Sequence, residues 1–104
     1  MFLCQWSLDI QFGKQKDALD VIKAWGADKM KLSGFSKSTG GRVYTGFIGE
    51  SAAHIVDEYI FESLDDFEKA LGDMGKPEFQ AHAKALAPFI IPGTQKWNIY
   101  KIVN

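Results

Sequence analysis

Strict alternation of side-chain character near the start of the chain is the feature that most constrains the fold. Along residues 2–12, FLCQWSLDIQF, one side carries only apolar residues and the other carries mainly polar ones. A period of two is typical of a β-strand with one buried face. The chain must therefore build a sheet that is covered on one side, with amphipathic helices as the cover.

The rest of the chain supplies those helices and further strands. From Lys14 to about Leu32 a helical stripe is apolar, and Ser63 is placed as the cap of a second helix over 64–71. Leu64, Phe67 and Leu71 of that second helix are expected to point inward. Pro77 suits the first position of a third helix over 77–87. The expected strands are 34–49 (one long strand or a hairpin kinked at Gly40-Gly41), 54–61 and 94–103. The stripe of the first helix is expected to comprise Ala18, Val21, Ile22, Trp25 and Leu32.

This order, β-α-β-β-α(α)-β, predicts a ferredoxin-like α+β fold with an antiparallel four-stranded sheet and helices on one face. We expect residues 1–104 to form one domain, since a chain of this length builds one core. The second face of the sheet would stay bare, although Val56 and Ile60 lie on it. A bare apolar face indicates that a partner covers it.

The stretch HIVDEYIF, residues 54–61, decides how the charged residues are grouped. On a helix, His54 and Glu58 would lie one turn apart and could share a metal ion or a proton. Its β-branched and aromatic residues favour a strand, on which His54 and Glu58 share a face but lie ~13 Å apart. Asp57 then points to the opposite, apolar face. The segment alone therefore cannot form a metal site, and no metal or cofactor is predicted.

Residues from neighbouring strands complete the polar patch around Glu58. Glu58 and Asp9 are candidate general bases and His54 a candidate catalytic partner, because an apolar surround can raise a carboxylate pKa toward neutrality. On the last strand, Trp97 and Tyr100 occupy opposite faces. The expected ligand-binding residues are Gln5, Ser7, Arg42, Tyr44 and Trp97. Each has an alternative reading as a solvated strand residue or an interface contact.

Charge and cysteine content exclude several classes of partner. The net charge is −1 and Arg42 is the sole arginine, so the basic field of a nucleic-acid binder is missing. An RNA-recognition domain of this topology would also need aromatic and basic residues on the third strand, which carries Asp57 and Glu58. No apolar run could cross a membrane. A single cysteine, Cys4, and no signal-like start favour a cytoplasmic location.

The run YIFESLDDFEKALGDMGKPEFQAHAKALAPFIIPGTQKWNIYKI, residues 59–102, resembles the second half of dimeric α/β-barrel proteins. That superfamily includes NIPSNAP-type domains and antibiotic-biosynthesis monooxygenases. The resemblance implies a homodimer in which two sheets pack face to face around a cavity for small, often aromatic, molecules. Its members include cofactor-independent oxygenases, haem-handling enzymes, isomerases and proteins of no known activity.

Two functions follow from these observations. The first is binding of a small apolar or aromatic molecule in the barrel cavity, with cofactor-independent oxygenase or isomerase-type chemistry as a possible extension. The second is a non-catalytic dimerisation or ligand-sensing module, in which the same polar groups satisfy one another. Neither requires a nucleic acid or a membrane as partner.

Overall fold

A computed structural model describes residues 1–104 and contains one four-stranded sheet with three α-helices. The elements in chain order are β1 (Phe2–Asp9), α1 (Gln15–Leu32), the 3₁₀ turn η1 (Gly34–Lys37), β2 (Thr39–Thr45), β3 (His54–Phe61), α2 (Leu64–Asp73), α3 (Pro77–Leu86), the 3₁₀ turn η2 (Ala87–Phe89) and β4 (Lys96–Lys101). None of the helices is long and apolar enough to span a membrane.

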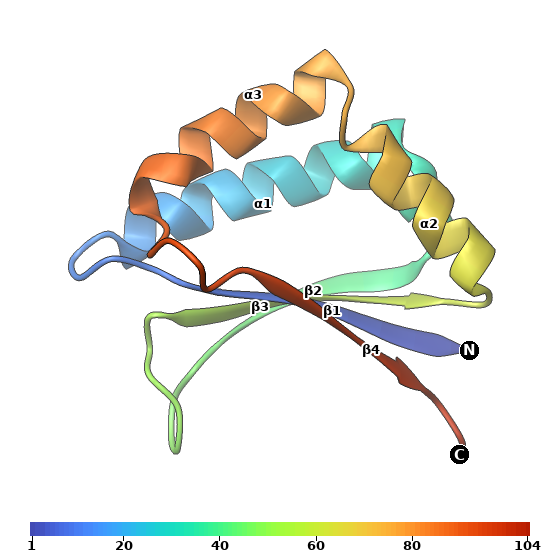
Figure 1. Cartoon of the computed structure of the whole chain (residues 1–104), viewed down its shortest axis with the longest axis horizontal. Coiled ribbons are helices and arrows are strands. Elements are labelled where there is room, and N and C mark those ends of the chain that lie inside the picture. Colours follow the sequence, from blue (N-terminus) through green and yellow to red (C-terminus); the bar gives the residue numbers. More distant parts are fainter.

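The sheet has the strand order β2-β3-β1-β4, and every pairing is antiparallel. All three α-helices lie on one of its faces, and the other face carries no helix (Figure 1). This confirms the predicted ferredoxin-like α+β fold. In the central pair, Gln5 lies opposite Glu58 and Asp9 lies opposite His54. The first and third strands are thus direct neighbours, as expected.

The starts of α2 and α3 and the kink in β2 lie where the sequence predicts them. The hydroxyl of Ser63 accepts a hydrogen bond from the backbone N–H of Asp66 (3.1 Å), which caps α2. Pro77 occupies the first turn of α3, where its missing N–H leaves no bond unmade. β2 has an irregular register between Thr39 and Arg42, and Gly40 has a φ of 47°. The expected kink at Gly40-Gly41 is therefore present.

Four local expectations were wrong. β1 ends at Asp9 instead of continuing to residue 12, and Phe12, expected on the buried face, is fully exposed. Residues 34–37 form a 3₁₀ turn instead of the start of a strand, so β2 is shorter than expected. Leu32 is 54% exposed, and the buried stripe of α1 continues through Lys29 instead. Leu64, expected to point inward, is exposed at the first position of α2.

The core lies between the sheet and the helix layer in two clusters. One cluster joins β1 to α1 and α3, and the other joins β3 to η1 and α2. Trp97 of β4 packs against both. The larger cluster comprises Trp6, Leu8, Ile10, Ala18, Ile22, Trp25, Ile55, Phe79, Leu86 and Ile90.

Candidate functional site

Most of the residues expected to form a site lie on the helix-free face of the sheet. There the Gln5 amide donates to Glu58 Oε1 (2.9 Å), and the Tyr44 hydroxyl donates to Glu58 Oε2 (2.8 Å). Arg42 lies opposite Glu58 in the β2–β3 register. Glu58 is therefore already held by partners from β1 and β2 within one subunit.

A shallow hollow adjoins Glu58 on the same face. Its volume is about 170 Å³. It is lined by Thr39, Gly40, Arg42, Glu58 and Ile60. Ser7 lies further along β1, opposite Val56, and is buried. The structure thus brings Gln5, Arg42, Tyr44 and Glu58 together but leaves Ser7 outside this group.

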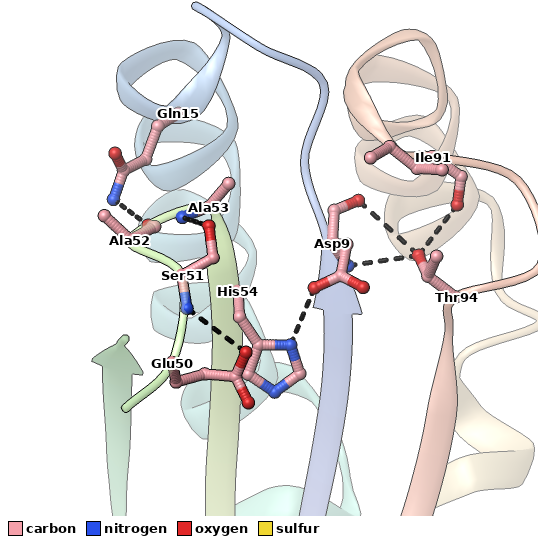
Figure 2. A network of polar contacts seen from close by, with 9 residues as sticks. All are labelled: Asp9, Gln15, Glu50, Ser51, Ala52, Ala53, His54, Ile91 and Thr94. Atoms are coloured by element: carbon pink, nitrogen blue, oxygen red, sulfur yellow. Dashed lines mark hydrogen bonds and ion pairs between the residues drawn. The ribbon is translucent and has the colours of Figure 1, made fainter. Parts of the chain in front are cut away.

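Asp9 and His54 form a second, separate pair at the end of β1. His54 Nδ1 lies 2.7 Å from Asp9 Oδ1, and the backbone N–H of Asp9 donates to Thr94 Oγ1 (3.0 Å). Thr94 in turn donates to the Ile91 carbonyl (2.7 Å), so the network ties β1 to the turn before β4 (Figure 2). These contacts link β1, the start of β3 and the turn before β4. Asp9 and His54 therefore both have hydrogen-bond partners within the subunit.

Trp97 lies apart from the other expected ligand contacts. It pairs with Trp6 in the β1–β4 register, and the two rings stack with centroids 6.4 Å apart on the helix side. Tyr100, which pairs with Leu3, lies on the alternate face. The expected grouping of Trp97 with Glu58 is therefore not formed.

Beneath the helices, three polar side chains meet inside the core. Lys29 Nζ of α1 donates to Asp57 Oδ2 of β3 (3.1 Å), and the Tyr59 hydroxyl donates to the same oxygen (3.0 Å). Lys29 and Asp57 are only 3% and 2% exposed. Charged residues are almost never this buried unless they are paired. We call this group the Lys29–Asp57–Tyr59 cluster.

Aromatic rings surround the ammonium of this cluster. Lys29 Nζ lies 4.6 Å from the ring centroid of Trp25, 5.2 Å from that of Phe35 and 5.5 Å from that of Trp6. Each distance is within the range of a cation–π contact. The rings take the place of water around a cation that has lost its hydration shell.

Burial shifts the protonation equilibria of the cluster. Loss of hydration lowers the pKa of Lys29, and the nearby Asp57 carboxylate offsets part of this change. Burial likewise raises the pKa of Asp57, against the opposing effects of Lys29 and the Tyr59 hydrogen bond. The pKa of Tyr59 is raised by burial and by the Asp57 charge. Burial thus acts against the charged form of both groups, and their mutual attraction opposes it.

Two cavities flank the cluster. The first, which we call the aromatic cavity, has a volume of about 200 Å³. It is lined by Trp6, Trp25, Lys29, Phe35, Leu71, Met74, Gln80, Ala83, Gln95 and Trp97. The second, the Gly26 cavity, has a volume of about 300 Å³ and reaches Asp57 and Tyr59 beside Gly26 of α1. Lys29 thus lines one cavity, and Asp57 and Tyr59 line the other.

The wall of the aromatic cavity also contains an unpaired donor. The indole N–H of Trp25 is buried and has no hydrogen-bond partner. A buried donor without an acceptor costs about 1–3 kcal/mol. Such a defect beside Lys29 is typical of a place where packing has not been optimised for stability alone.

The comparisons with known proteins identify the fold. No protein-family model matches the chain, and no curated protein matches it by sequence. Solved structures match over nearly its whole length. The fold is that of NIPSNAP and antibiotic-biosynthesis monooxygenase proteins.

Three of these structures illustrate the likeness. A NIPSNAP family protein of unknown function from Agrobacterium tumefaciens is 22% identical, with a TM-score of 0.76 over 98% of this chain and 87% of that one. A NIPSNAP domain protein from Burkholderia xenovorans has a TM-score of 0.78 at 14% identity, and the match covers 99% of this chain and 95% of that one. A mutant of SnoaB, a cofactor-independent oxygenase from Streptomyces nogalater, has a TM-score of 0.74 at 14% identity. The match covers 99% of this chain and 93% of that one. At these identities the likeness establishes the fold alone.

Sequence reasoning missed Lys29, although a signal for it exists. Ala18, Ile22, Trp25 and Lys29 follow one another at intervals of four, three and four, so Lys29 continues the buried stripe of α1. Asp57 was placed on the apolar face, but only as an argument against a metal site. A lysine and an aspartate that both fall on buried faces are a predictable ion pair. No group of three His, Cys, Asp or Glu side chains is arranged to hold a metal ion.

Proposed function

We propose that this protein binds a small apolar or aromatic molecule in the aromatic cavity, against the amine of Lys29. The observation that carries the proposal is an ion pair enclosed by aromatic side chains and bordered by a cavity. Ligand sites are mostly apolar pockets with a few convergent polar groups, and this description fits the aromatic cavity. It lies between the sheet and the helices of one subunit.

The size of the cavity limits the ligand. A closed apolar cavity of roughly 150 Å³ can hold benzene. The aromatic cavity, at about 200 Å³, therefore suits a single ring with a small substituent. Its exposed polar residues, Gln80 and Gln95, provide the side from which such a molecule would enter.

The cluster also supports a reaction class. Asp57 is a carboxylate with a raised pKa beside an amine, and groups of this kind serve as general bases or acids near neutral pH. Isomerase-type chemistry, or a cofactor-independent oxygenase reaction that begins with proton removal, would use the Lys29–Asp57 pair in that role, with Lys29 as the member that lines the aromatic cavity. This extension depends on the cluster and is not inherited from SnoaB, which shares only the fold.

We further propose that a second copy of the chain covers the helix-free face. Val56 and Ile60 are only half-buried there, and the loop between β2 and β3 extends from the sheet on the side away from the helices (Figure 1). That loop carries Phe47 and Ile48, both about nine-tenths exposed. Apolar side chains that project past a bare sheet face suit contact with another such face.

A non-catalytic dimerisation or ligand-sensing module is the second candidate. It is favoured by the polar contacts of the helix-free face, where Glu58 is bonded to Gln5 and Tyr44 and His54 to Asp9. Groups with partners inside the subunit need no substrate. In this function the aromatic cavity would hold an effector that is not transformed.

Binding can be measured directly, because all three tryptophans of the chain line the aromatic cavity. We expect benzyl alcohol to change tryptophan fluorescence saturably and to raise the melting temperature. Ala83→Leu, which fills the cavity from α3, should abolish both effects. Ala85→Leu, an exposed change on the same helix, should leave them intact. Equal responses from both variants would overturn binding in the aromatic cavity.

A further inference from the structure

Lys29 has the surroundings of a reactive amine. Lys29 is one of the residues that line the aromatic cavity, and its Nζ lies 3.1 Å from the Asp57 carboxylate and 3.5 Å from the Tyr59 hydroxyl. We propose that Lys29 captures a small aldehyde or ketone in the aromatic cavity as a reversible imine. The inference rests on the proposed function, because the carbonyl compound would occupy the same cavity, and it narrows the ligand class to carbonyl compounds.

A lysine attacks a carbonyl group only as the neutral amine, so it must first lose a proton. Asp57 Oδ2 is already the acceptor of an Nζ–H hydrogen bond, which provides a direct route for that proton. Removal from water further weakens the hold of Lys29 on its proton, because burial lowers its pKa. Exposed lysines such as Lys16 and Lys69 also lie beside a carboxylate, at 3.2 and 3.0 Å, but they remain in water.

The reaction can be written with these groups alone. Asp57 takes a proton from Lys29, and the amine lone pair attacks the carbonyl carbon to form a C–N bond while the π electrons move to oxygen. One of the two remaining N–H protons passes to that oxygen, giving a carbinolamine. Asp57 then donates its proton to the hydroxyl, the C–O bond breaks, and water leaves as the nitrogen lone pair forms the C=N bond.

The charge of the cluster is the same before and after this sequence. It begins as an ammonium beside a carboxylate and ends as a protonated imine beside the same carboxylate. The buried site therefore never holds an unpaired charge, which would be strongly unfavourable in this apolar surround. A ligand that is itself charged, such as a carboxylate, would break this balance.

Reductive trapping tests the inference on the folded protein. Benzaldehyde and sodium cyanoborohydride convert an imine into a stable benzylamine, and peptide mapping then identifies the modified residue. We expect Lys29 to be modified on the order of tenfold faster than any other lysine at neutral pH. Lys16, which is exposed and lies 3.2 Å from the Asp20 carboxylate, is the internal reference for an ordinary lysine. In urea the preference for Lys29 should disappear.

Three variants and a competing ligand test whether the modification occurs at Lys29 and in the aromatic cavity. Lys29→Arg keeps the positive charge but cannot form an imine, so only the Lys29 modification should be lost. Ala83→Leu should slow modification of Lys29, whereas Ala85→Leu should not. Benzyl alcohol, which has the same ring and no carbonyl group, should compete with benzaldehyde.

The outcomes separate this inference from the proposed function. If benzyl alcohol binds and Lys29 is modified no faster than the exposed lysines, the imine is overturned and the binding function stands. If Lys29 is modified equally fast in Ala83→Leu, the aldehyde reaches it by another route and the inference is also overturned. If neither compound binds, the proposed function itself fails.

Discussion

At the scale of single residues, the Lys29–Asp57 pair is hard to explain by stability. The two charges are taken out of water at a cost of several kcal/mol for each ion, and their attraction often does no more than offset it. Apolar residues of similar volume would stabilise the same position at least as well. The pair between Nζ and Oδ2, 3.1 Å apart inside an aromatic core, is better explained by binding or chemistry.

A double-mutant cycle tests this explanation. Lys29→Met and Asp57→Leu, made singly, should each lower the free energy of unfolding by about 3–5 kcal/mol, because each leaves an unpaired buried charge. The double variant should regain most of that loss while losing ligand binding. Urea denaturation gives the three values. Losses that simply add in the double variant would show that the two charges do not stabilise each other.

Cys4 provides a second test at this scale. It is fully buried in β1, and loss of hydration raises the pKa of its thiol to about 11. Because the thiolate is the reactive form, a maleimide at about pH 8 should leave the folded protein unmodified. Unfolding in urea should make the thiol react at the rate of a free cysteine. Since Cys4 is the single cysteine, the whole signal belongs to it, and fast labelling of the folded chain would contradict its burial.

At the scale of elements, α1 carries an unfavourable residue next to a cavity. Gly26 lies in the helix interior, where glycine costs about 1 kcal/mol relative to alanine. A Cβ atom placed there would meet no atom within 4 Å, because the position borders the Gly26 cavity. Neither packing nor backbone geometry therefore requires a glycine.

We expect Gly26→Ala to raise the free energy of unfolding by roughly 0.5–1 kcal/mol. Gly72→Ala is the matched control, since a Cβ there also has nothing within 4 Å. Its gain should be smaller because Gly72 lies in the last turn of α2. Thermal and urea unfolding measure both. A clear loss of stability in Gly26→Ala would mean that the space beside α1 closes in solution.

At the scale of the whole molecule, the two faces of the sheet are covered unequally. Three helices cover one face of the sheet and no helix covers the other (Figure 1). Contact between two such faces would complete a barrel and remove Val56 and Ile60 from water. The dimer stays a prediction.

Sedimentation or size-exclusion measurements test the dimer. Val56→Glu, on the helix-free face, should convert a dimer into a monomer because it places a charge in the proposed contact. Leu32→Glu is the control, since Leu32 is an exposed apolar residue of the helix layer, away from the proposed contact. A wild-type protein that is monomeric at micromolar concentration would contradict the proposed interface.

Features set by interactions between residues close in the sequence could be predicted, and features set by long-range packing could not. The alternation along β3 correctly placed Asp57 and Glu58 on opposite faces of the sheet, because side-chain direction along a strand is a local property. The topology placed Gln5 and Glu58 on the same face of neighbouring strands, but their direct pairing came only from the structure. In contrast, the exposed position of Leu32 depends on where the helix layer ends, which local periodicity does not specify.

By itself, the sequence determined the order of elements, the ferredoxin-like fold and, for β1 and β3, the face on which each residue lies. These follow from periods of two and 3.6 residues and from capping signals, all of which act within a few positions. Only the tertiary structure decided that Lys29 meets Asp57 among aromatic rings with a cavity on either side. That contact joins a helix to a strand 28 residues away, and its distance is set by how the two layers pack.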